Sequence, residues 1–123
     1  MKVVLIGVGG WGKNHARILS QLGVLTAICD TDDEKRKEFD KKYSVNSYKN
    51  FNEMLESENF DAAFVCTPTN THYQIATRLI QEKKDVFVEK PMTYLSEDGQ
   101  KLIELAKKNK VVLTCGYIER FNP

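Results

Sequence analysis

The sequence lacks any long hydrophobic run. Nowhere among its 123 residues do apolar residues approach the about 20 consecutive positions that a membrane-spanning helix needs. Lys2 leads directly into the first apolar stretch, without the short apolar segment and cleavage site of a signal peptide. We therefore expect a soluble, cytoplasmic protein with no membrane partner.

An excess of either charge is also missing. Eighteen Lys and Arg residues face 17 Asp and Glu residues, which gives a formal net charge of +1. Binding to nucleic acid draws much of its affinity from an excess of cations against phosphates. The charge balance therefore argues against a nucleic-acid partner, and the basic pairs at 41–42 and 107–108 are interpreted as solvated helix ends.

Cysteine is scarce. The three residues Cys29, Cys66 and Cys115 are an odd number and show no CxxC spacing, so neither a disulfide framework nor a zinc site is expected. Each follows or ends an apolar run, where a reduced cysteine acts as a small hydrophobe. With 41% hydrophobic residues, the chain is expected to form one domain, 1–123, with a proper core and no metal site.

The first 30 residues carry the most informative pattern. An apolar run at 3–6 meets the glycine series Gly7-x-Gly9-x-x-Gly12, then a helical pattern follows, and a second apolar run ends at Asp30. This order predicts a strand, a tight turn at the start of a helix, and a second strand. The N-terminus of such a helix binds a pyrophosphate through free backbone N–H groups and the helix dipole.

The glycines and the acid have separate predicted roles. Gly7 permits the sharp turn, Gly9 the approach of the phosphates, and Gly12 the close packing of helix on strand. Asp30 lies 18 residues after Gly12, near the about 20-residue offset of an acid that accepts hydrogen bonds from a ribose. A solvated Asp30 in an ordinary strand–helix–strand unit, or a site for S-adenosylmethionine, remains an alternative at this point.

The residues around Asp30 also predict which dinucleotide binds. A carboxylate at this position accepts from both ribose hydroxyls and repels a 2′-phosphate. Asp32 and Asp33 add negative charge, whereas Arg36 is more than a turn away. NAD is therefore predicted as the cofactor in preference to NADP.

Apolar runs and helical patterns alternate along the rest of the chain. Further strands are predicted at 24–29, 47–49, 61–66, 85–88 and 111–115, and helices at 12–22, 33–43, around 54–55, 71–82 and from 96 onward. Six strands alternating with helices predict an α/β fold: a doubly wound parallel Rossmann sheet in the order 3-2-1-4-5-6, with helices on both faces.

Several helix ends and inward faces follow from the same patterns. The expected helix caps are Asp32 or Thr31, Asn50 or Asn52, Asn70 or Thr69, and Ser96, with Gly23 as a stop signal. The apolar residues at helical spacing in the first helix are Ala16, Ile18, Leu19 and Leu22. The inward residues expected later are Phe39, Tyr43, Tyr73, Ala76, Leu79 and Ile80.

The unusual residues all follow predicted strand ends. Ligands of doubly wound sheets bind outside the carboxyl ends of the strands. We therefore expect a single crevice lined by residues 7–12, Asp30, Thr67-Pro68, Glu89-Lys90-Pro91 and Gly116-Tyr117.

Four ordered motifs in the chain resemble a known family. They are GVGGWG-x-x-H at 7–15, CTPTNTH at 66–72, EKP at 89–91 and GYIERFNP at 116–123. Together they resemble the N-terminal domain of the Gfo/Idh/MocA oxidoreductases over essentially the whole chain, which disfavours S-adenosylmethionine. Members of this family use NAD or NADP to oxidise or reduce a carbon of a sugar, cyclitol or nucleotide sugar.

The resemblance implies roles for individual residues. Lys90 would be the catalytic residue, contacting substrate beside the nicotinamide, and Pro91 would follow a cis peptide. The implied cofactor-binding residues are Gly7, Gly9, Gly10, Trp11, Gly12, Asp30, Thr67, Pro68, Asn70, His72, Glu89 and Lys90. A local hydrogen bond remains an equal alternative for His72, and a structural role is favoured for His15.

Family members continue into a second, C-terminal α+β domain that supplies the substrate pocket and an acid–base histidine. This chain ends where they enter that domain, so we expect a cofactor domain without a complete active site. The alternative is a stand-alone, non-catalytic NAD-binding sensor, and a homo-oligomer is compatible with either. The ending at 116–123 is more similar to UDP-N-acetylglucosamine 3-dehydrogenases than to inositol dehydrogenases.

Overall fold

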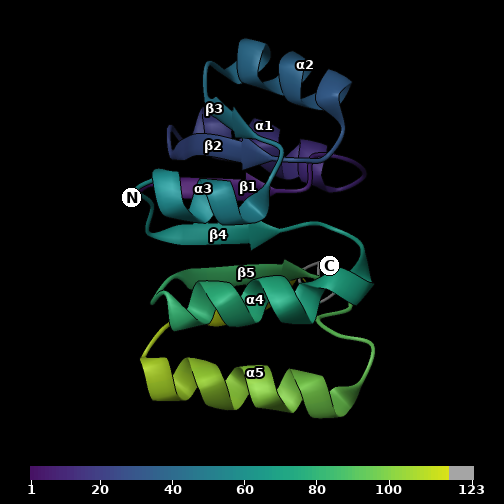
Figure 1. Ribbon diagram of the computed structural model, residues 1–123, viewed down its shortest axis with the longest axis vertical. Helices are drawn as coiled ribbons and strands as arrows, with labels where there is room; N and C mark the ends of the chain where they lie inside the picture. The colour runs from purple at the N-terminus through teal and green to yellow at the C-terminus, as the bar shows by residue number, and fades with distance from the viewer. Residues whose placement is uncertain (117–123) are drawn as a thin grey trace, which may run out of the picture.

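The computed structural model describes residues 1–116. These residues build a six-stranded parallel sheet in the order β3-β2-β1-β4-β5-β6, which confirms the predicted topology (Figure 1). The strands are β1 (Val3–Ile6), β2 (Leu25–Cys29), β3 (Asn46–Tyr48), β4 (Ala62–Val65), β5 (Asp85–Glu89) and β6 (Leu113–Gly116).

Helices cover both faces of the sheet. Figure 1 shows α3 and α4 in front of the central strands and α1 behind them. The helices are α1 (Gly12–Gln21), α2 (Asp33–Tyr43), α3 (Phe51–Ser57), α4 (His72–Gln81) and α5 (Ser96–Asn109), with a short 3₁₀ turn η1 (Thr69–Thr71) before α4. No helix within residues 1–116 is long and apolar enough to cross a membrane.

The central strand β1 separates two parts of the core. All four of its residues are buried, as expected where helices cover both faces of a parallel sheet. Val4 and Ile6 join the larger cluster, which includes residues of α3, α4 and α5, while Leu5 packs in a smaller cluster with Ala16 of α1 and Phe39 of α2. The inward faces predicted for α2 and α4 are thereby confirmed.

Side-chain caps were predicted correctly for two helices and incorrectly for two others. Asp32 accepts from the backbone N–H groups of residues 34 and 35, and Asn50 accepts from that of residue 53. Ser96 is not the cap of α5, because the helix begins at this residue and the carbonyl of Leu95 already accepts its first hydrogen bonds. Neither Asn70 nor Thr69 caps α4, since both lie inside η1.

Other differences from the sequence prediction are small. Ile18 and Leu22 have the expected spacing but are 45% and 67% exposed, so that of this set only Ala16 and Leu19 form the buried face of α1. The glycine stop signal is confirmed, since Gly23 has a φ of 72° directly after the helix. Of the last motif, only Gly116 lies among the described residues.

Candidate functional site

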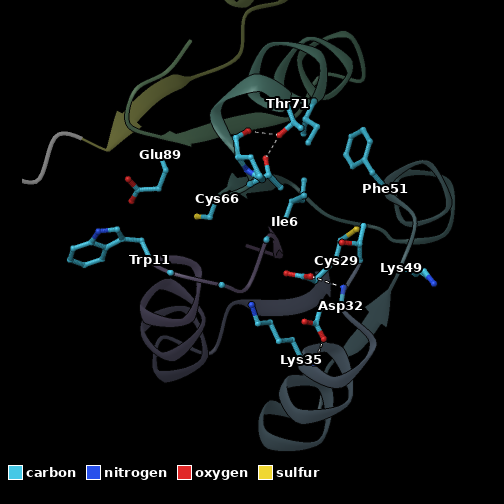
Figure 2. Close-up of a pocket in the computed structure, with 18 of the residues that line it drawn as sticks. Ile6, Trp11, Cys29, Asp32, Lys35, Lys49, Phe51, Cys66, Thr71 and Glu89 are labelled. Atoms are coloured by element: carbon cyan, nitrogen blue, oxygen red, sulfur yellow. Dashed lines mark hydrogen bonds between the residues drawn. The ribbon is translucent and has the colours of Figure 1, made fainter. Parts of the chain in front are cut away.

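An open cavity of about 820 Å³ lies at the carboxyl edge of the sheet. Figure 2 shows it between the glycine loop after β1, the end of β2 and the loops after β4 and β5. Of the residues predicted from the sequence, nine line this cavity: Gly7, Gly9, Gly10, Trp11, Asp30, Thr67, Pro68, Glu89 and Lys90. The fold therefore brings four separate segments of the chain to one place.

The glycine loop turns as tightly as the motif requires. Gly7 has a φ of 91°, and a Cβ there would lie 2.6 Å from the carbonyl oxygen of Cys66. At Gly12 a Cβ would lie 2.1 Å from the carbonyl oxygen of Gly7. Gly12 is thus buried at the start of α1 and does not line the cavity, whereas Gly9 and Gly10 do.

Asp30 connects the end of β2 to the glycine loop. Its Oδ2 accepts a hydrogen bond from the backbone N–H of Val8 at 2.9 Å, and its Oδ1 accepts one from that of Asp32 at 2.8 Å. A carboxylate oxygen has two lone pairs, so each oxygen keeps one acceptor position free for a hydroxyl. Asp30 therefore positions the loop and still has capacity to bind a ribose.

Lys35 brings a cation to the same edge. It extends from the first turn of α2 toward the glycine loop, where a Cβ on Gly9 would lie 3.1 Å from its Nζ (Figure 2). Among residues 1–116 no carboxylate lies within ion-pair distance of this ammonium. Its placement suits an anion bound against the loop.

The Glu89-Lys90-Pro91 segment is fixed by its own contacts. The Lys90-Pro91 peptide is cis, as the resemblance implied. Glu89 is only 8% exposed, and its carboxylate contacts His15 Nε2 at 2.7 Å and accepts from the backbone N–H of Lys90 at 3.0 Å. Lys90 itself is exposed at the cavity wall.

His72 lies behind the cavity rather than in its wall. The imidazole is 1% exposed, with Nε2 2.7 Å from the carbonyl oxygen of Thr67 and Nδ1 3.0 Å from that of Pro91. It thus joins the loop after β4 to the turn after β5. Asn70 is exposed and does not line the cavity.

Sequence reasoning missed part of the cavity wall. Asp32 and Thr31 were considered only for capping or charge, and Lys35, Lys49, Phe51, Thr71 and Ile75 were not proposed at all. Phe51 begins α3 and Ile75 lies in α4, so their approach depends on how these helices cross the sheet edge. No motif or spacing would have identified these two residues.

The two thiols that line the cavity are held in the neutral form. Burial raises the pKa of Cys66 to about 12, and the nearby Glu89 carboxylate adds to this effect. Burial, followed by the charge of Asp30, raises the pKa of Cys29 to about 11. Within residues 1–116, no group of three or more His, Cys, Asp or Glu side chains is arranged to hold a metal ion.

Comparison with known proteins gives one consistent family. Residues 1–117 match the Gfo/Idh/MocA family model, described as an oxidoreductase family with an NAD-binding Rossmann fold. The chain is 36% identical to the myo-inositol 2-dehydrogenase of Thermotoga maritima, an alignment that covers 99% of this chain and 37% of that protein. It is 29% identical to the UDP-N-acetylglucosamine 3-dehydrogenase of Acidithiobacillus ferrooxidans, covering all of this chain and 39% of that one.

Solved structures agree with the sequence matches. The structure of the Acidithiobacillus ferrooxidans enzyme superimposes with a TM-score of 0.92. The WlbA dehydrogenase of Bordetella pertussis, solved in complex with NADH and UDP-GlcNAcA, superimposes with a TM-score of 0.84 at 29% identity over 90% of this chain and 34% of that one. The chain thus spans well under half of the length of each of these relatives.

Proposed function

Since the chain belongs to the Gfo/Idh/MocA oxidoreductase family and corresponds to its NAD-binding Rossmann domain, we propose that it binds NAD for a dehydrogenase of sugars, cyclitols or nucleotide sugars. The observation that carries this proposal is the convergence of the glycine loop, Asp30 and Lys90 on one cavity. Bound NAD would supply the hydride acceptor, and the protein would supply binding, orientation and charge.

The residues present fit a dinucleotide. The glycine loop places the start of α1 against the cavity, and nothing lies within 4 Å of the position that a Cβ on Gly10 would take. A pyrophosphate could therefore approach the backbone there and meet the positive end of the helix dipole. Asp30 would accept from the adenosine ribose hydroxyls, which favours NAD over NADP.

Lys90 is the residue we assign to chemistry. Its ammonium would donate a hydrogen bond to the reacting hydroxyl and stabilise negative charge that develops on that oxygen. Glu89 accepts from the backbone N–H of Lys90, which fixes the main chain that carries this ammonium.

The substrate is proposed as a polyol ring that carries a secondary hydroxyl. The relatives include an inositol dehydrogenase and a nucleotide-sugar dehydrogenase, so they do not separate these two classes. The motif at 116–123 favours UDP-N-acetylglucosamine oxidised at its 3-position, but residues 117–123 lie outside those that the structure describes. A non-catalytic NAD sensor is the second candidate, since Asp30 and the glycine loop alone would serve it.

The proposed function is tested with Trp11, the only tryptophan of the chain. This side chain lines the cavity and is 50% exposed. Titration with NADH should quench its fluorescence and transfer energy to the reduced nicotinamide in a saturable way. The Asp30→Ala variant should weaken this binding, whereas Asp40→Asn, on the far part of α2, should not. Absence of saturable transfer at millimolar NADH would contradict the proposal.

Turnover separates the two candidate functions. If the chain is the cofactor domain of an enzyme, it should reduce NAD when it is supplied with a family substrate domain and a polyol. Lys90→Met should abolish this reduction even at saturating NAD. A sensor would bind NADH equally well and show no Lys90-dependent reduction under any of these conditions.

A further inference from the structure

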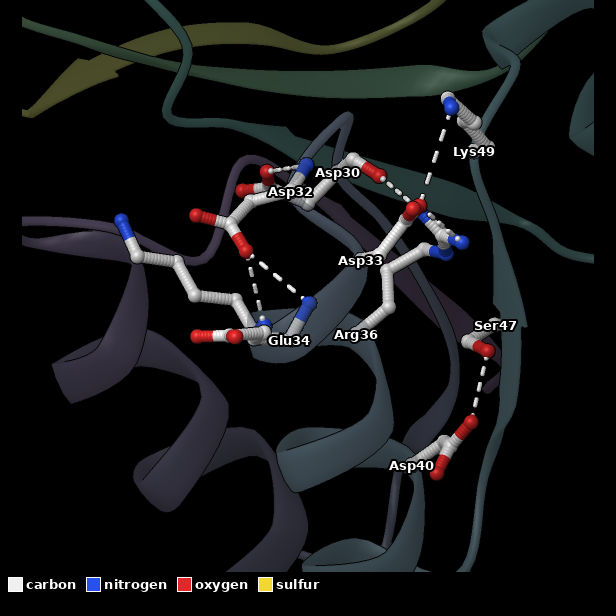
Figure 3. A network of polar contacts seen from close by, with 9 residues as sticks. Asp30, Asp32, Asp33, Glu34, Arg36, Asp40, Ser47 and Lys49 are labelled. Atoms are coloured by element: carbon white, nitrogen blue, oxygen red, sulfur yellow. Dashed lines mark hydrogen bonds and ion pairs between the residues drawn. The ribbon is translucent and has the colours of Figure 1, made fainter.

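Three cations lie around the acidic end of β2, and they differ in their partners. Arg36 Nη2 lies 2.8 Å from Asp33 Oδ1, and Lys49 Nζ lies 3.7 Å from the same oxygen. Figure 3 shows this carboxylate between the two cations, beside Asp30. Lys35, in contrast, extends toward the glycine loop. One carboxylate thus engages two of the three cations.

Of the two engaged cations, Lys49 lines the cavity and Arg36 lies against the backbone of Asp30 without lining it. Arg36 Nη1 donates to the backbone carbonyl oxygen of Asp30 at 3.1 Å, which places the guanidinium directly behind the acid. A 2′-phosphate would be carried by the same ribose that meets Asp30. Arginine and lysine are the side chains that bind a phosphate most effectively.

The charge of Asp30 is already partly compensated. Both of its oxygens accept from backbone N–H groups, those of Val8 and Asp32. These N–H dipoles point at the carboxylate and reduce the field that it presents to an approaching phosphate. Repulsion of a 2′-phosphate by Asp30 is therefore opposed by the attraction of any unpaired cation nearby. Whether Arg36 and Lys49 are paired with a carboxylate then decides whether NADPH binds.

We propose that Asp33 is a specificity-determining residue, which keeps Arg36 and Lys49 from a 2′-phosphate and thereby makes the site select NAD over NADP. This inference rests on the proposed function. It assigns the selection to an ion pair in the first turn of α2 rather than to Asp30 alone. The Arg36 guanidinium, followed by Lys49, also lowers the pKa of Asp33, the direction expected for a carboxylate paired with two cations.

Neighbouring acids do not share this role. Asp32 is occupied as the cap of α2, where its Oδ1 accepts from the backbone N–H groups of Glu34 and Lys35. Glu34, like Asp33, is exposed and does not line the cavity, but it has no cation within ion-pair distance among residues 1–116. It carries the same charge in the same helical turn as Asp33, so Glu34→Gln is the matched control for Asp33→Asn.

The test compares the Kd values of NADH and NADPH for the chain of residues 1–123, measured by energy transfer from Trp11. Asp33→Asn should strengthen NADPH binding about tenfold and change NADH binding less than about twofold, as expected for one released charge-assisted contact. Adding Arg36→Met to Asp33→Asn should remove most of this gain. Glu34→Gln should leave the ratio of the two Kd values as in the wild type.

The outcomes separate the two proposals. If the wild-type chain binds neither dinucleotide, the proposed function fails and this inference fails with it. If the chain binds NADH but Asp33→Asn leaves the Kd ratio unchanged, or Glu34→Gln changes it equally, the inference alone is overturned. The side-chain amide of Asp33→Asn could still accept a hydrogen bond from Arg36, so Asp33→Ala repeats the test without it. The Kd of each variant for NADH verifies that its site is folded.

Discussion

His15 Nε2 lies 2.7 Å from Glu89 Oε1, a contact that joins the first helix to the end of β5 across 74 residues of sequence. The imidazole also lies edge-on to the rings of Phe64 and Phe87, with centroids 5.3 and 5.2 Å away. The carboxylate thus has a side-chain partner whose imidazole packs against two aromatic rings. Because its other oxygen accepts from the backbone N–H of Lys90, the contact also supports the segment that carries the proposed catalytic lysine.

This contact predicts a measurable coupling. His15→Ala should lower the free energy of unfolding by about 1–3 kcal/mol, because it removes the only side-chain partner that residues 1–116 give this buried carboxylate. In a double-mutant cycle with Glu89→Gln, we expect a coupling of about 1 kcal/mol, measured by urea unfolding. Strictly additive effects would show that the two side chains are merely neighbours.

The topology could be predicted from the sequence because its causes are local. The apolar runs are long enough for one strand each, and each of the first five strands is followed by a helix. The inward face of such a helix is marked by apolar residues three and four apart, such as Phe39 and Tyr43. The parallel order then follows from the short right-handed crossovers between strands. The ends of elements were predicted less well: β6 begins at Leu113 rather than at residue 111, and at Ser96 the chain enters the helix one residue earlier than the cap pattern indicated.

The sequence predicted those parts of the site in which a motif directly follows a strand. It did not predict the contacts that long side chains from different elements make with one another. The glycine loop, Asp30 and Lys90 come directly after strands, so topology alone placed them at one edge. Lys35 reaches Gly9 through a flexible four-carbon side chain, whose direction no spacing rule specifies. The engagement of Lys49 with Asp33 likewise depends on how β3 lies beside the start of α2.

The glycine loop predicts two substitutions of different severity. A Cβ on Gly12 would lie 2.1 Å from the backbone oxygen of Gly7, so the helix would have to move away from the loop. At Gly10 nothing lies within 4 Å, and only the φ of 50° opposes a side chain. Gly10→Ala should cost about 1–2 kcal/mol in the free energy of unfolding, measured by urea unfolding. Gly12→Ala should cost clearly more and should also abolish NADH binding; equal costs would contradict the described turn.

Cys66 predicts a loss of stability at alkaline pH. Burial raises its pKa from 9.0 to about 12 in the folded chain. The stability that the neutral thiol contributes is fully present below pH 9.0, the value of an unperturbed thiol, and is lost as pH rises toward the folded value. Between pH 8 and pH 10, ionisation of the unfolded thiol should therefore cost about 1 kcal/mol.

The measurement is urea unfolding of the wild type and Cys66→Ala at both pH values. The variant should lose less stability than the wild type over this interval, even if its stability at pH 8 is lower. Cys29 has a similarly raised pKa of about 11. It should therefore contribute the same loss of stability to the wild type and to Cys66→Ala. Identical losses in the two proteins would show that Cys66 does not titrate as described.

Lys35 predicts a loss of affinity that does not discriminate between cofactors. Its ammonium lies beside Gly9, on the side of the cavity where the pyrophosphate would meet the loop, and both NADH and NADPH carry this group. Lys35→Met should therefore raise both Kd values by a similar factor of about five to twenty, as expected for one lost charge-assisted contact. The affinity of the variant should also depend less on salt, because one fewer cation contributes to binding.

The control is Lys37→Met, which changes an exposed residue of the same helix that does not line the cavity. If Lys35→Met weakened NADPH alone, this lysine and not the Asp33 pair would be the group that meets a 2′-phosphate, and the assignment of selectivity to Asp33 would have to be given up.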